Sequence, residues 1–172
     1  MVSLKWGDVL STLLPGTVAL FAVAPYFPLL NDRINNLDNS GVAGGFALLI
    51  ASALAGGFLE AFTRITWERF VLVRLCRPRD ILSNLNAENI DLYERGVQGS
   101  YKYATFYANF AWATILLLFT RIDHGAAICS VATALLAGMV VILLLASYVQ
   151  WTYYVNYQTK VFKEKGTKDA GK

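Results

Sequence analysis

Four long apolar runs constrain the fold of this chain more than any other feature. They cover approximately residues 13–30, 41–62, 101–119 and 126–148, with short polar segments between them. A helix of roughly 20 mainly apolar residues crosses the ~30 Å hydrocarbon core of a bilayer. Lipid offers no hydrogen-bond partners, so the backbone of each run must pair within itself as a helix. The sequence therefore predicts an all-α integral membrane protein, in which residues 1–172 form a single four-helix transmembrane domain.

The composition agrees with the membrane class. Only 16% of the residues are charged and 56% are hydrophobic, whereas an ordinary soluble domain carries about 25% charged residues. The formal net charge of +3 is small and unevenly distributed, which indicates a membrane topology rather than nucleic-acid binding. The lipid bilayer is therefore an expected partner, and a nucleic acid is not.

Three prolines interrupt the first run. We expect residues 3–13 to form a short interfacial helix. Pro15 then either begins the spanning helix, because the first turn tolerates a missing N–H, or kinks the helix. Pro25 and Pro28 are predicted to distort or end the far side of this span, since proline breaks the backbone hydrogen-bond ladder. Residues 31–40 are predicted to form a polar turn.

The helical pattern of the second run continues past the membrane as far as Pro78. A helix over residues 41–77 would be roughly 55 Å long at ~1.5 Å per residue, which exceeds the thickness of the hydrocarbon core. A second helical pattern leads into the third run. The second helix is therefore expected either to protrude from the membrane or to bend and lie on its surface. The second and third spans are predicted to extend into a cytoplasmic helical hairpin over residues 64–100.

The basic residues predict the orientation in the membrane. Seven lie in residues 64–102 and five lysines lie in residues 158–172, whereas the other two turns hold one each, Arg33 and Arg121. Basic residues accumulate on the cytoplasmic side of membrane proteins. Both termini and the middle segment are therefore predicted to be cytoplasmic, and the inner (cytoplasmic) membrane of a bacterium is the expected location.

The fourth run ends in an aromatic cluster made of Tyr148, Trp151, Tyr153, Tyr154 and Tyr157. Amphipathic rings favour the boundary between lipid and water, so we expect this cluster to form an interfacial belt. The basic segment that follows, residues 158–172, is predicted to be a cytoplasmic tail that is disordered at its end.

Two of the predicted spans carry a stripe of small residues. The first stripe consists of Gly41, Gly45, Ser52 and Gly56, and the second of Gly96, Ser100, Ala104 and Ala108. Small residues let helix backbones approach closely in lipid, where van der Waals contact drives association. The stripes are therefore candidate helix-packing seams. The sequence leaves open whether they pack within one bundle or between protomers of a homo-oligomer.

Three polar residues within or beside the spans are candidates for a polar network, because intramembrane polar groups are costly and often functional. Glu60 is the only acid within an apolar run, and Arg64 follows it four residues later. The two form either a pore mouth or proton relay, or an interfacial ion pair. Asn109 either bonds neighbouring helices together or lines a pore.

The predicted extension carries a group of arginines, Arg69, Arg74, Arg77 and Arg79. These side chains suit anionic headgroups or a cytosolic protein partner. No catalytic or cofactor-binding signature occurs in the chain, and neither the two cysteines nor the single histidine has the spacing of a metal site. We therefore expect a non-enzymatic protein without a cofactor or a metal.

Three functional hypotheses follow. The first is a membrane protein that works as a homo-oligomer, as an effector, sensor or conduit, by analogy with small multi-span proteins of bacterial stress or anti-phage defence systems. The second is a scaffold or accessory subunit that anchors a cytosolic or membrane partner through residues 64–100. The third is a membrane enzyme that acts on lipid, which only Glu60 and the nearby arginines support. The sequence favours the first.

Overall fold

The computed structural model describes residues 6–76, 98–125 and 130–169, and this part of the chain is helical without any strand. Four helical stretches within it are long and apolar enough to cross a membrane. These stretches are Val9–Tyr26, Gly41–Leu75, Gly99–Asp123 and Val131–Gln158. The predicted all-helical class and the four helices of membrane length are therefore confirmed.

Helix α1, Trp6–Val23, runs unbroken through Pro15. The predicted separation into an interfacial helix over residues 3–13 and a spanning helix that starts at Pro15 is therefore wrong. A proline inside a helix removes one backbone hydrogen bond and costs about 3 kcal/mol. Here Pro15 is fully buried and precedes Gly16, which lies against the backbone of Ser52 and Gly56. This packing against a second helix offsets the loss.

The far end of α1 leads into two short helices. The 3₁₀ turn η1, Ala24–Tyr26, contains Pro25, and helix α2, Pro28–Asn35, starts with Pro28. Both prolines occupy early helical positions, where the missing N–H costs nothing. The prolines thus end α1 as predicted. The prediction of a polar turn over residues 31–40 is wrong. Residues 31–35 belong to α2, and only Asn36 separates α2 from the next helix, which starts at Leu37.

Helix α3, Leu37–Thr63, continues through the π-helical segment η2, Arg64–Leu72, into the short helix α4, Val73–Leu75. The 35 residues of Gly41–Leu75 correspond to about 50 Å at 1.5 Å per residue, more than the ~30 Å hydrocarbon core. This helical stretch is therefore longer than the hydrocarbon core is thick, as predicted. The return limb of the predicted hairpin falls in residues 77–97, outside the described part of the chain.

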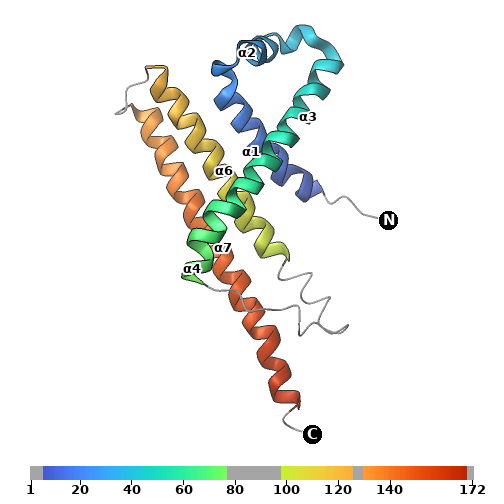
Figure 1. The fold of residues 1–172 in the computed structure, drawn as a ribbon, viewed down its shortest axis with the longest axis vertical. Coiled ribbons are helices and arrows are strands. Elements are labelled where there is room, and N and C mark those ends of the chain that lie inside the picture. Colours follow the sequence, from blue (N-terminus) through green and yellow to red (C-terminus); the bar gives the residue numbers. More distant parts are fainter. Residues whose placement is uncertain (1–5, 77–97, 126–129, 170–172) are drawn as a thin grey trace.

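Helices α6, Gln98–Asp123, and α7, Val131–Asp169, lie side by side and antiparallel (Figure 1). Gly125 has a φ of +84° in the turn after α6, a conformation that favours glycine. The Oγ of Ser130 accepts a hydrogen bond from the Thr133 N–H at 3.2 Å, which caps the start of α7. This helix reaches Asp169, so most of the tail predicted over residues 158–172 is helical.

Helix α6 is the centre of the fold, because it packs against α1, α3 and α7, and α1 also crosses α3 (Figure 1). One core cluster, Ala19, Leu59 and Ala113, joins α1, α3 and α6. A second cluster, Leu72, Ala104 and Trp151, joins η2, α6 and α7. Alanines at both centres permit the close backbone approach that stabilises helix pairs in lipid.

The aromatic cluster near the end of α7 faces in two directions. Trp151 is 2% exposed, and its Nε1–H donates to the Cys76 carbonyl at 3.1 Å. The Trp151 ring lies 6.2 Å from Tyr101 and 5.1 Å from Tyr154 between centroids. Tyr153, by contrast, is 60% exposed. Trp151 therefore belongs to the core between α6 and α7, whereas Tyr153 lies on the surface.

Candidate functional site

A polar pocket of about 240 Å³ lies where α1, the end of α3 with η2, and the first half of α6 meet. Its lining residues are Ser11, Thr12, Glu60, Arg64, Tyr101, Lys102, Thr105, Phe106 and Asn109. Glu60, Arg64 and Asn109, the three polar residues that the sequence singles out, all line this one pocket. The helix crossing brings them together from positions up to 49 residues apart in the chain (109 − 60).

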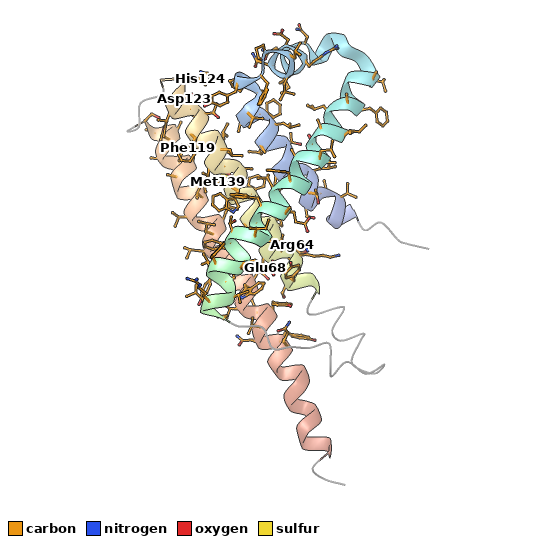
Figure 2. The ribbon with its side chains drawn as sticks, viewed as in Figure 1. Arg64, Glu68, Phe119, Asp123, His124 and Met139 are labelled. Carbon is orange, nitrogen blue, oxygen red and sulfur yellow. The ribbon has the colours of Figure 1, made fainter. Side chains whose placement is uncertain are left out.

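An ion pair within one wall of the polar pocket and two contacts of Tyr101 between its walls organise the polar groups. Arg64 Nη2 donates to Glu60 Oε1 at 2.6 Å, one helical turn away. The Arg64 guanidinium carbon lies 5.9 Å from the centroid of the Tyr101 ring on α6, within the range of a cation–π contact. The Tyr101 hydroxyl donates to Glu68 Oε2 at 3.1 Å. Figure 2 shows Arg64 and Glu68 on one stretch of helix beside the start of α6.

The backbone of η2 is π-helical over nine residues. Such a segment widens the helix and occurs frequently at functional sites. It begins at Arg64, directly after the turn that holds Glu60, and it includes Glu68. The unusual backbone therefore starts at the polar pocket and changes the register of the residues that follow.

Asn109 is 3% exposed, and its Oδ1 has no hydrogen-bond partner within the described part of the chain. A buried acceptor without a partner costs about 1–3 kcal/mol. Native proteins pair nearly all such atoms, so each exception requires an explanation. Asn109 therefore combines a position at the polar pocket with a buried amide oxygen that has no partner among the described residues.

The C-terminal half of the first small-residue seam contacts α1. A β-carbon on Gly56 would collide with the Thr12 carbonyl oxygen, so the two backbones touch there. The Thr17 hydroxyl donates to Ser52 Oγ at 3.1 Å, which adds a hydrogen bond between the same helices. Ser52 and Gly56 therefore pack within one chain.

The N-terminal half of that seam has a different environment. Gly41 has a φ of +59°, so it marks a break near the start of α3 that a residue with a side chain would strain. A β-carbon on Gly41 or Gly45 would meet no atom within 4 Å. Neither glycine is therefore required for packing within the chain.

The second small-residue seam faces α7. Ala104 and Ala108 are buried and Ser100 is half-buried, while Gly96 lies outside the described residues. The Ser147 hydroxyl on α7 donates to the Ala104 carbonyl at 2.8 Å, and Trp67 Nε1–H donates to Ser147 Oγ at 3.1 Å. One hydroxyl thus bonds three helical segments, η2, α6 and α7.

The arginines of the extension are only partly described. Arg69 and Arg74 are exposed on η2 and α4, and the Arg74 guanidinium carbon lies 6.0 Å from the Phe70 ring centroid. Arg77 and Arg79 lie outside the described residues. The two described arginines are therefore exposed in the helical stretch after Arg64, and neither lines the polar pocket.

A further contact closes the opposite end of the bundle, where Figure 2 shows Asp123 and His124. The hydroxyl of Tyr26 donates to Asp123 Oδ2 at 2.8 Å, and the Tyr26 ring lies 5.6 Å from His124. The sequence interpretation overlooked this contact, and also overlooked Gly16 as a packing residue. Thr12 and Gly16 are four residues apart, as are most neighbouring members of the two small-residue seams. This spacing in the sequence could have identified Gly16 as a packing residue.

Among the residues that the structure describes, no three His, Cys, Asp or Glu side chains are grouped so that they could hold a metal ion. Comparisons with protein families, with curated proteins and with solved structures find no match to this chain. Four apolar helices are compatible with a membrane protein, and the polar pocket is the feature with the clearest chemistry.

Proposed function

We propose that this chain is a small non-enzymatic membrane protein that works as an assembly of several copies, as an effector or conduit. The observation that carries the proposal is the polar pocket, in which Glu60, Arg64 and Asn109 meet between spanning helices. Charged and amide side chains at such a position are costly in lipid, and they commonly mark pathways for ions or protons. The buried Oδ1 of Asn109 has no partner among the described residues, and an unsatisfied acceptor of this kind is unusual outside functional sites.

The requirement for several copies has its own support. The polar pocket has a volume of about 240 Å³ and lies at one end of the bundle, so a path across the membrane needs further walls. The open half of the first seam, Gly41 and Gly45, offers a backbone surface that nothing in the described chain covers. Such a surface suits the close approach of a second helix.

Crosslinking tests the assembly. A single cysteine at Gly45, in a Cys76→Ser, Cys129→Ser background, is expected to form a disulfide-linked dimer in membranes. Leu135→Cys is the matched control, because Gly45 and Leu135 are each four residues after the first residue of their spans, and Leu135 is 70% exposed on α7. Equal crosslinking at both positions would indicate random collision and contradict the proposed interface.

Ion flux tests the role of the polar pocket. Proteoliposomes that contain the wild-type chain are expected to dissipate an ion gradient faster than empty liposomes. Glu60→Gln should change that rate by roughly tenfold, because the substitution removes a partly desolvated charge from the polar pocket. Asp32→Asn is the control, because Asp32 is exposed on α2 and does not line the pocket. A wild-type flux no greater than that of empty liposomes would contradict a conduit.

A second candidate function is a scaffold, which the length of the second span favours. Because Gly41–Leu75 exceeds the hydrocarbon thickness, η2 and α4 extend beyond the bilayer, and they expose Phe70 (56%) and Leu75 (62%) beside the two visible arginines. A stoichiometric partner that co-purifies with the wild-type chain and with Phe58→Ala, but is lost from Phe70→Ala, would support this function. Phe58 is 75% exposed but lies within the predicted membrane segment. Retention of the partner by Phe70→Ala would contradict it.

A further inference from the structure

A second cavity lies at the opposite end of α3 and is mainly apolar. It has a volume of about 520 Å³ and lies between α2 and the first half of α3. Its lining residues are Leu30, Arg33, Ile34, Ala43, Gly44, Ala47, Leu48 and Ala51. We call this cavity the α2–α3 groove. Its volume falls within the range of ~300–1,000 Å³ that is typical of small-molecule sites.

The sequence explains why the α2–α3 groove exists. The contributions of α3 recur at helical spacing, so they form one face of the helix, and four of these five residues are alanine or glycine. Side chains this small cannot reach the facing side chains of α2. The groove follows α3 from Ala43 to Ala51, about 12 Å at 1.5 Å per residue, so it is elongated along the predicted membrane normal.

One charged residue, Arg33, lines the α2–α3 groove, and no acidic residue does. Arg33 is exposed in the last turn of α2, next to the reversal of the chain at Asn36. Among the side chains that the structure describes, which exclude those of residues 37–40, the ion pair found joins Arg64 and Glu60 and does not involve Arg33. The groove therefore presents a cationic side chain at the predicted lipid–water boundary and an apolar channel below it.

We propose that the α2–α3 groove binds an anionic glycerophospholipid, with one acyl chain along Ala43–Ala51 and the phosphate at Arg33. In lipid, an apolar groove gains nothing by excluding water, so its selectivity must come from packing and charge. An interfacial arginine attracts an anionic headgroup, and the small residues of α3 accommodate the chain. The site requires one copy of the protein and goes beyond the proposed function.

Native mass spectrometry of the full-length protein provides the test. The protein is reconstituted with equal amounts of phosphatidylglycerol and phosphatidylcholine that carry the same acyl chains, and retained lipids are counted per chain. The wild-type protein is expected to retain phosphatidylglycerol roughly fivefold better at one site, a factor typical of one interfacial cation. Arg33→Gln is expected to abolish that preference. Arg121→Gln is the matched control, because Arg121 is exposed at the same end of the bundle but does not line the groove.

A second variant tests the apolar part. Ala47→Phe fills the α2–α3 groove and is expected to remove one retained lipid of either type without changing the number of protein copies. Equal retention of the two lipids by the wild-type protein would overturn the proposal, as would equal losses in Arg33→Gln and Arg121→Gln. A fall in copy number in Ala47→Phe, with lipid retention unchanged, would identify a second copy of the chain as the occupant and also overturn it.

Discussion

A β-carbon on Gly16 would collide with the backbone carbonyl oxygen of Ser52 and would lie 2.7 Å from the backbone nitrogen of Gly56. Helices α1 and α3 therefore touch backbone to backbone at this crossing. The contact fixes the angle between the two helices. That angle determines where Thr12 meets Glu60 at the polar pocket, and how far the first half of α3 lies from α2 at the groove.

Gly16→Ala is accordingly expected to destabilise the chain by about 1–3 kcal/mol, the usual cost of overpacking. The neighbouring atoms are backbone, so they cannot move aside as a flexible side chain would. Unfolding in mixed detergent measures the change. Gly57→Ala is the control, because a β-carbon there meets no atom within 4 Å. A loss of stability in Gly57→Ala as large as that in Gly16→Ala would show that loss of glycine itself, rather than the crossing, is responsible.

The four spans could be predicted because length and hydropathy are local properties of the sequence. The course of α1 through Pro15 could not, because the helix is held there by α3, which is more than 30 residues away in the chain. The burial of Trp151 was missed for the same reason. A tryptophan at the end of a span looks interfacial by composition, and only the position of Cys76 shows that its N–H has a partner in the protein.

The polar pocket was predictable only in part. The pairing of Glu60 with Arg64 follows from a spacing of four on one helix. The position of Asn109 beside them depends on how α6 crosses α3, which no local pattern encodes. The α2–α3 groove was not predicted either. The sequence pattern of residues 31–40 indicated a turn, and a turn has no helical face that could line a cavity.

Ser147→Ala is expected to destabilise the protein by about 0.6 kcal/mol and by at most about 1.7 kcal/mol, the average and the maximum for interhelical hydrogen bonds in membranes. The hydroxyl both donates to Ala104 and accepts from Trp67, so Trp67→Phe should cost less in the Ser147→Ala background than in the wild type. A double-mutant cycle on the free energy of unfolding measures this coupling. Thr152→Val is the control, because its hydroxyl bonds only within its own helix at the exposed Tyr148 carbonyl. Additive costs would contradict a shared network.

Trp151→Ala is expected to cost about 3–5 kcal/mol, as is typical of a buried tryptophan. The ring fills the core between η2, α6 and α7, and its truncation also leaves the Cys76 carbonyl without its donor. Tyr153→Ala, two residues away and 60% exposed, should change stability by less than about 0.5 kcal/mol. Both changes are read from unfolding curves in detergent. Similar losses in the two variants would contradict a core position for Trp151.

Asn109→Leu provides the sharpest separation of stability from function. The Oδ1 of Asn109 is buried without a partner in the described chain, so a leucine of similar size removes an unsatisfied acceptor and is expected to stabilise the fold by up to ~1 kcal/mol. The same change makes the polar pocket more apolar and should slow ion flux in proteoliposomes. Asn156→Leu, at an exposed position on α7, is the control and should leave flux unchanged. A destabilised Asn109→Leu variant with normal flux would indicate that Asn109 serves only to hold the helices together.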